Sequence, residues 1–397
     1  MNSRSLRRDA SLSALFAGLI AVVVSYAGPL LVVLEAARQG GLDARQTASW
    51  VWAISVASGL LCLFASWITR TPVMVAWSIP GAALLVGLLP QHEYSDVIGA
   101  FIVCGLLSAL LGFTGWIGKL MRATPRPITA AVLAGVLVPF ALKVAQAVAQ
   151  QPVVAGGLVI GYLLGRRWEP RFAVILAMTF GGILAVATGQ SNPMHVELGL
   201  TLPVWTMPTF SLDTVLAVAL PLALVTAVGQ DAPGLIVMQN SGYQVNDRAL
   251  IGANGLVGAA MAPFGSHAIN LAAVTASIAI SPESHPDRAR RYVASMSCGV
   301  VYIVGGFLAS TIVSLFSTIP PQMLTAVAGV ALLSPLQNAV YDTMHEGGHH
   351  RSVTEAALIT FVVTASGISA LGLVAAFWGL FAGLVAYAIL RPRTPAA

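Results

Sequence analysis

Residues 73–89 read VMVAWSIPGAALLVGLL, an apolar stretch with Pro80 and Gly81 near its middle. The stretch is too short to cross the hydrocarbon core of a bilayer as one regular helix, which takes about 20 residues. A second short apolar stretch, AINLAAVTASIAI, occupies residues 268–280. Two interrupted apolar segments in one chain are typical of a membrane protein whose broken helices line a cavity.

The rest of the chain is equally apolar. Of its 397 residues, 57% are hydrophobic and 9% are charged, and the mean hydropathy is +0.83. A soluble domain carries about 25% charged residues, so lipid must cover much of this surface. The net charge is +5, but the basic residues are spread over short loops, which excludes nucleic acid as a partner. Three cysteines lie in apolar runs and are expected to be buried, namely Cys62, Cys104 and Cys298.

The chain divides into about fourteen apolar segments, and it therefore predicts an all-α polytopic membrane protein. The segments are 11–37, 47–69, 73–89, 96–114, 127–149, 152–165, 171–188, 211–238, 249–262, 268–280, 290–313, 323–341, 352–369 and 370–390. Most arginines and lysines fall in alternate loops, and residues 189–210 contain none. The positive-inside rule then predicts cytoplasmic termini, an outside position for residues 189–210 and a multi-pass protein of the cell (inner) membrane.

The two halves of the chain share a pattern. Identical spacing relates Pro125, Thr129, Ala130 and Pro139 to Pro321, Thr325, Ala326 and Pro335. We predict two seven-span repeats, residues 1–205 and 206–397, and an odd number of spans inverts the second copy. Spans 3 and 10 would then meet near the midplane, where the N-termini of their half-helices favour an anion such as a carboxylate. This arrangement indicates a secondary transporter; a chance match of common residues is the alternative.

Two ionisable residues are candidates at membrane depth. Asp231 lies in the middle of the eighth segment, and an ionisable group there is a functional candidate because burying a charge is costly. It could carry a proton, or it could form a structural hydrogen bond at a helix break. His267 lies at the entrance of the tenth segment, one turn before Asn270. It could exchange a proton or contact a carboxylate, or it could be a satisfied structural histidine.

Other residues have simpler interpretations. Trp77 could stack on an aromatic ring beside the break, or it could belong to an interfacial tryptophan belt. Glu35 and Arg38 are spaced for a local ion pair on one helix. The motif His345-Glu346-Gly347-Gly348-His349 fits the H-E-x-x-H pattern of zinc proteases, but its two adjacent glycines oppose the helix that this chemistry needs. An intramembrane metalloprotease using His345, Glu346 and His349 is therefore a remote alternative. We expect that the protein is not an enzyme and binds no metal and no cofactor.

Five stretches together resemble the BenE-type benzoate/proton symporter family over nearly the whole chain. They are AWSIPGAALL (76–85), APFGSHAINLAA (262–273), SPESHPD (281–287), TASG (364–367) and AFWGL (376–380). The resemblance implies a uracil-permease-like fold, in which spans 1–4 and 8–11 form a core and spans 5–7 and 12–14 form a gate. It also implies import of benzoate or a related aromatic carboxylate together with protons.

The resemblance implies a substrate site between spans 3 and 10, with span 8 nearby. The expected substrate-binding residues are Tyr26, Gly28, Trp77, Ser78, Pro80, Gly81, Gln230, Ser266, His267, Asn270, Leu271 and Ala272, and the expected proton-coupling residues are Asp231 and His267. In span 8 the family pattern is Gln-Asn-Ala-Pro-Gly, whereas this chain has Gln230-Asp231-Ala232-Pro233-Gly234. Asp231 is therefore not the general proton carrier of the family, and a carboxylate there could repel an anionic substrate.

The expected partners are a small aromatic carboxylate, protons and membrane lipid, and a homodimer is left open. A nucleobase or an inorganic anion is the alternative guest for the same fold, and a channel is a further alternative.

Overall fold

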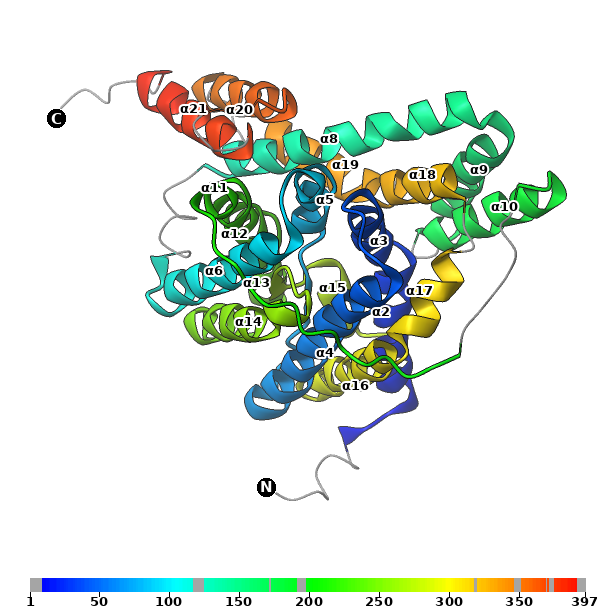
Figure 1. The fold of residues 1–397 in the computed structure, drawn as a ribbon. Helices are drawn as coiled ribbons and strands as arrows, with labels where there is room; N and C mark the ends of the chain where they lie inside the picture. Colours follow the sequence, from blue (N-terminus) through cyan, green and yellow to red (C-terminus); the bar gives the residue numbers. More distant parts are fainter. Residues whose placement is uncertain are drawn as a thin grey trace.

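The computed structural model describes residues 9–116, 125–170, 173–190, 198–317, 320–345, 351–368, 370 and 375–390. Over these residues the chain is mostly helical (Figure 1). The expectation of an all-α chain needs one correction, because two three-residue strands, β1 (Val75–Trp77) and β2 (Ile269–Leu271), pair in antiparallel fashion. Each strand lies in one of the two short apolar segments that the sequence predicts to be broken.

Helices overlap every predicted apolar segment. In the first half they are α2 (Leu12–Ala27), α3 (Pro29–Gln39), α4 (Ala44–Thr69), α5 (Ile79–Leu88), η1 (Leu89–Gln91), α6 (Tyr94–Phe113), α8 (Arg126–Gln150), α9 (Pro152–Trp168) and α10 (Ala173–Ala187). In the second half they are α11 (Leu212–Thr214), η3 (Val215–Ala219), α12 (Leu220–Thr226), η4 (Ala227–Asp231), α13 (Ala232–Asn240), α14 (Asp247–Met261), η5 (Ala262–Phe264), α15 (Val274–Ile280), η6 (Arg288–Arg290), α16 (Tyr292–Phe307), α17 (Ala309–Ser317), α18 (Pro321–Ala331), α19 (Leu333–His345), α20 (Arg351–Ala365) and α21 (Ala375–Leu390). Elements α11 to α13 form one continuous helix that widens into π-turns at η3 and η4, before Pro221 and Pro233, because a proline cannot donate to the helical ladder.

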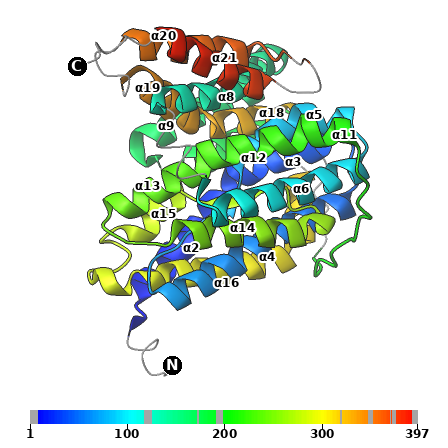
Figure 2. The same ribbon diagram turned by 90° about the vertical axis from the view of Figure 1, so that its left-hand side faces the viewer.

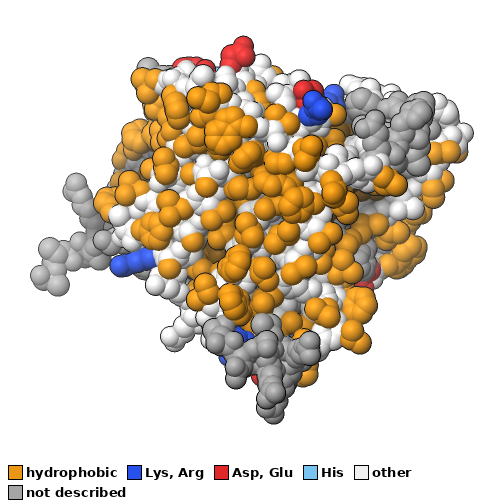
Figure 3. Space-filling view, turned by 60° about the horizontal axis from the view of Figure 1, so that its bottom comes forward, with side chains coloured by type: hydrophobic (Ala, Val, Ile, Leu, Met, Phe, Trp, Pro, Cys, Tyr) orange, Lys and Arg blue, Asp and Glu red, His pale blue; other side chains and the backbone are white. Residues whose placement is uncertain are grey.

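Six helices in the described part of the chain are long and apolar enough to cross a membrane by themselves, and a seventh span is added when α16 and α17, bent by 70°, are counted together. The other segments are shorter or broken. Large apolar side chains are strongly exposed, among them Leu12 (74%) and Ile68 (73%). The face in Figure 3 is covered largely by hydrophobic side chains, with few charged ones. Such a surface requires lipid rather than water around it.

The helices pack in two groups. We call the first the strand-containing bundle; it comprises α2–α6, α11–α17, β1 and β2, and its closest helix pairs are α4 with α16 and α6 with α14. We call the second the helical flank; it comprises α8–α10 and α18–α21 and lies to one side of the bundle in Figures 1 and 2. The two groups meet where α18 packs on α3 and where α8 packs on α5 and η4.

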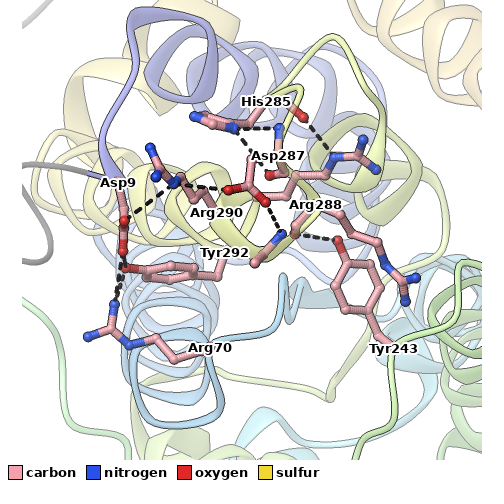
Figure 4. Close-up of polar contacts among 10 residues, drawn as sticks. Asp9, Arg70, Tyr243, His285, Asp287, Arg288, Arg290 and Tyr292 are labelled. Carbon is pink, nitrogen blue, oxygen red and sulfur yellow. Dashed lines mark hydrogen bonds and ion pairs between the residues drawn. The ribbon is translucent and has the colours of Figure 1, made fainter.

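A polar cluster joins the segments at the start of α2, the end of α4 and the start of α16 (Figure 4). Asp9 accepts a hydrogen bond from the Tyr292 hydroxyl (2.7 Å), which also bonds to Arg70, and Arg290 Nε lies 3.6 Å from Asp9 Oδ1. Beside them, the Arg288 guanidinium lies 4.5 Å from the centre of the Tyr243 ring. These contacts hold the start of α2, the end of α4 and the start of α16 in a fixed relation.

Candidate functional site

The two strands lie side by side at the centre of the site, and we call the place where they pair the crossing of β1 and β2. Val75 faces Leu271, Ala76 faces Asn270, and Trp77 faces Ile269. Two further backbone hydrogen bonds extend the pairing, one from Ser78 N–H to Ala268 O (3.0 Å) and one from Ala272 N–H to Met74 O (2.9 Å). Since the strands are antiparallel and each precedes its own helix, α5 and α15 leave the crossing in opposite directions.

Side chains from neighbouring helices bond to the outer edges of both strands. Cys62 Sγ accepts from Val75 N–H (3.1 Å) and donates to Val75 O (3.2 Å). On the other strand, Asp231 Oδ1 accepts from Leu271 N–H (2.9 Å). Extended backbone inside a membrane must have its polar groups satisfied by protein, and these side chains meet that requirement. Asp231 is 3% exposed, so it is a buried carboxyl group attached directly to the interrupted segment of the predicted span 10.

The two helices that follow the strands begin differently. Helix α5 has ten residues, and Ser78 caps it by accepting from Gly81 N–H (3.1 Å). The Ser78 hydroxyl also accepts from the Thr226 hydroxyl (2.7 Å), which attaches the start of α5 to α12. Helix α15 has only seven residues and no side-chain cap. The predicted pair of half-helix N-termini is thus unequal, and α5 is the better candidate for a fixed dipole near the crossing.

Three aromatic rings surround the end of β1. The Trp77 ring lies 5.9 Å from Tyr26 and 5.6 Å from Tyr302, centre to centre. The Tyr26 hydroxyl donates to Ser55 (2.7 Å) and the Tyr302 hydroxyl to Ser25 (2.7 Å), so both phenols are held in place. Trp77 is 1% exposed, which contradicts its placement in an interfacial belt. Its Nε1 atom has no hydrogen-bond partner among the described residues.

His267 bridges α4 and the start of α5. The Trp50 indole N–H donates to His267 Nδ1 (3.0 Å), and His267 Nε2 lies 3.0 Å from the Ser78 carbonyl oxygen. The imidazole is 1% exposed and packs edge-on against the rings of Trp50 and Phe101. Both ring nitrogens are therefore occupied by protein groups.

The remaining predicted residues surround the same crossing at different depths. Asn270 Nδ2 donates to Leu271 O (2.8 Å), while Asn270 Oδ1 and Ser266 Oγ are buried and have no partner among the described residues. Gln230 is half-buried, and Ala272 is buried. Gly28 separates α2 from α3, and a Cβ there would lie 3.5 Å from Ala331 of the helical flank.

Two glycines lie where the helix breaks pack closely together. A Cβ on Gly81 would approach Leu222 of α12 to 2.5 Å, so no larger side chain fits at the start of α5 without movement. A Cβ on Gly229 would lie 3.2 Å from Pro80 Cγ and from Leu133 of α8. The breaks in the predicted spans 3 and 8 are thus in direct contact next to the helical flank.

Several residues of the site gave no signal in the sequence. Trp50, Thr226 and Tyr302 lie in ordinary apolar runs, and only the packing of α4, α12 and α16 brings them to the strands. Cys62 was expected to be a buried cysteine, which is confirmed, but its bond to β1 was not foreseen.

Within the described ranges, no group of three or more His, Cys, Asp or Glu side chains could hold a metal ion. In the H-E-x-x-H motif, residues 346–349 lie outside the described residues, and His345 is the last residue of α19.

The chain is similar to known transport proteins over almost its full length. A family model described as "BenE: Benzoate membrane transport protein" matches residues 8–389. The benzoate membrane transport protein of Acinetobacter baylyi is 35% identical over 391 residues, which cover 98% of both chains. The inner membrane protein YdcO of Escherichia coli is 37% identical over 377 residues, which cover 95% of both chains.

Solved structures with the same fold are more distant in sequence. The transmembrane domain of the cyanobacterial bicarbonate transporter BicA matches with a TM-score of 0.62 at 14% identity, covering 95% of this chain and 97% of that one. SLC26A9 matches with a TM-score of 0.61 at 12% identity, covering 94% of this chain and 65% of that one. The family and fold neighbours are membrane transporters, not enzymes. The chain belongs to the BenE benzoate membrane transport family.

Proposed function

We propose that this protein imports benzoate or a related aromatic carboxylate across the inner membrane, coupled to protons. The observation that carries the proposal is the match to the benzoate membrane transport family over residues 8–389. The geometry supports it with an aromatic cluster and a buried carboxyl group beside two interrupted segments.

The fold in this proposal is a seven-plus-seven inverted repeat with halves 1–205 and 206–397. Two matching helix contacts support it: α4 in the second span packs on α16 in the eleventh, and α6 in the fourth span packs on α14 in the ninth. A two-fold axis relating the halves would exchange these two pairs. The antiparallel pairing of β1 and β2, which lie in spans 3 and 10, is compatible with such an axis.

In the proposed mechanism the strand-containing bundle is the core and the helical flank is the gate. Most polar side-chain contacts stay within one group, such as Tyr162 with Ser334 in the flank (3.4 Å). Movement of the core along the gate would carry the crossing of β1 and β2 from one side of the membrane to the other. Both termini are cytoplasmic in this orientation, and residues 189–210 are outside.

The proposed substrate site lies around the strand crossing. The residues proposed to contact the substrate are Tyr26, Gly28, Trp77, Ser78, Pro80, Gly81, Gln230, Ser266, Asn270, Leu271 and Ala272. His267, which was also expected among them, has both ring nitrogens bonded to protein groups and is assigned no contact with the substrate. Trp77 offers a ring and an N–H donor that has no partner among the described residues, which suits an aromatic ring bearing a carboxylate. The N-terminal end of α5 favours the negative charge.

Asp231 is the proposed proton carrier of this chain. A carboxylate beside a bound anion repels it, and the repulsion disappears when Asp231 binds a proton. Proton binding is then a condition for benzoate binding, which couples the two. One proton with one monoanion makes the transport electroneutral, so the pH gradient alone drives it.

The test is uptake of radiolabelled benzoate by proteoliposomes under an imposed pH gradient. Benzoic acid crosses lipid unaided, so protein-free vesicles under the same gradient are the control. The proposal requires an initial rate that exceeds this control, saturates with benzoate and depends on the gradient. A rate equal to that of the empty vesicles rejects it.

An inorganic anion is the second candidate, because the neighbours in fold are titled a bicarbonate transporter and an anion transporter. Inhibition of uptake by bicarbonate or sulfate with no inhibition by benzoate would favour it. Inhibition by uracil would favour a nucleobase instead.

A further inference from the structure

We infer that His267 is a positioning residue: as a neutral imidazole it fixes the start of α5 by connecting Trp50 of α4 to the backbone of Ser78. The role in transport rests on the proposed function, because α5 is assigned there to substrate binding. The bonding of the ring does not depend on the identity of the substrate.

The hydrogen bonds determine which ring nitrogen carries the proton. An indole nitrogen can only donate, so Trp50 Nε1 donates to His267 Nδ1, and Nδ1 must be an acceptor. A carbonyl oxygen can only accept, so His267 Nε2 carries the proton and donates to Ser78 O. A second ring proton on Nδ1 would point at the Trp50 N–H and break that bond. The arrangement therefore accommodates only the neutral ring.

The turn that carries His267 is itself fixed on α4. The Ser49 hydroxyl donates to Phe264 O (2.9 Å), and Gly265 has a φ of +108°, which favours glycine. A Cβ at Gly265 would lie 2.8 Å from Trp50 Cα, so the turn lies directly against the helix. This contact sets the distance between α4 and the His267 ring.

Ser78 connects the His267 ring to β1 and α5. Its carbonyl accepts from His267 and from Ala82 N–H, its N–H donates to Ala268 O, and its hydroxyl accepts from Gly81 N–H and Thr226. Ser78 ends β1 and caps α5, so a displacement of its carbonyl moves both Trp77 and the first turn of α5. His267 thus acts on the substrate through Ser78.

The described contacts of the ring include no ionised side chain. Its neighbours are the aromatic rings of Trp50 and Phe101 and the carbonyl of Ser78. Asp231, the acidic residue of the site, bonds instead to Leu271 on the outer edge of β2. The two candidate proton carriers consequently occupy separate hydrogen-bond systems.

The first test is nitrogen NMR of protein with ¹⁵N-labelled histidine rings in lipid, with His267→Gln used to assign the signal. The expected result is a neutral ring protonated at Nε2 that does not titrate between about pH 5 and 8. A ring that gains a second proton in this interval, or a neutral ring protonated at Nδ1, overturns the inference. The NMR test of the ring's protonation does not depend on whether benzoate is the substrate.

The second test compares benzoate transport by two variants. The glutamine of His267→Gln can accept from Trp50 and donate to Ser78, so its KM should stay within about threefold of wild type with an unchanged pH profile. His267→Leu leaves the buried Trp50 N–H unpaired and removes one of two donors from the Ser78 carbonyl, which still accepts from Ala82 N–H, so its KM should rise about tenfold or more. If His267→Leu does not fold, Trp50→Phe removes one of the two bonds from the other side and should raise KM with the same pH profile.

Three outcomes overturn the inference. Loss of gradient-driven uptake in His267→Gln with intact benzoate exchange makes His267 a proton carrier. Equal impairment of His267→Gln and His267→Leu removes the role of the two hydrogen bonds. A wild-type KM in His267→Leu removes the positioning role. Absence of benzoate transport in the wild-type protein would reject the proposed substrate, whereas the NMR result would still decide the bonding of the ring.

Discussion

Replacing Asp231 by Asn separates the two roles of this side chain. Its carboxyl group is 3% exposed and accepts a hydrogen bond from Leu271 N–H (2.9 Å). The oxygen of an Asn amide can accept the same bond in nearly the same volume, but the amide cannot bind a proton. Asp231→Asn should therefore fold with β2 in place. Asp231→Ala, the matched control, leaves a buried N–H unpaired and should lose about 1–3 kcal/mol of stability.

The size of the effect on binding follows from linkage. If benzoate binds only when Asp231 carries a proton, protonation favours binding, and affinity falls as pH rises. The wild-type Kd should increase about tenfold for each pH unit once the free protein is mostly deprotonated. In Asp231→Asn the side chain is neutral at every pH, so its Kd should be independent of pH. At high pH the variant should bind more tightly than the wild type.

The assay is equilibrium binding of radiolabelled benzoate to purified protein between about pH 6 and 9, where benzoate stays ionised. Vesicles containing Asp231→Asn should still exchange benzoate across the membrane but should not accumulate it under a pH gradient beyond the protein-free control. A wild-type Kd that does not change with pH would show that benzoate binding does not require a proton on Asp231. Equal slopes in the variant and the wild type would assign the proton to another residue.

Three further predictions concern the aromatic cluster, the helix packing and the topology. Trp77→Phe keeps a ring but removes the Nε1 donor, so benzoate affinity should fall about fivefold, as measured by the same binding assay. Gly59→Ala places a Cβ 2.7 Å from the backbone of α16 and should lower the free energy of unfolding by about 1–3 kcal/mol. Thermal unfolding in detergent measures the loss. The control is Gly87→Ala, whose Cβ would have nothing within 4 Å and should not destabilise the protein. A cysteine at Leu200, which is 74% exposed, should react with an impermeant maleimide in intact cells, and one at Arg351 only after permeabilisation; the reverse pattern would reject the orientation.

The sequence was informative wherever a short-range pattern has a direct structural meaning. The segments 73–89 and 268–280 were predicted to be broken because of their length, and both are interrupted by strands. Glu35 and Arg38 were predicted to pair from their spacing, and they lie 2.8 Å apart. Local spacing sufficed in both cases.

The conformation of the breaks could not be predicted. Short apolar runs fit a strand or a helix equally well by pattern, so β1 and β2 were not foreseen. The seven-residue length of α15 was equally hidden in its apolar run. Strand pairing depends on contacts between residues almost two hundred positions apart, which no local pattern encodes.

The partners of the site residues depend on the same long-range packing. The bond between Trp50 and His267 joins α4 to the entry of β2, and the bond between Asp231 and Leu271 joins η4 to β2. The sequence identified His267 and Asp231 by their chemistry at membrane depth. It could not show that both ring nitrogens of His267 are occupied, or that Asp231 bonds to the edge of β2.

A crystal structure of the protein with benzoate bound would locate the substrate directly. We expect density for the ring and its carboxylate at the crossing of β1 and β2, in contact with Trp77 and the first turn of α5. Benzoate bound away from both strands, with this crossing unchanged, would contradict this expectation.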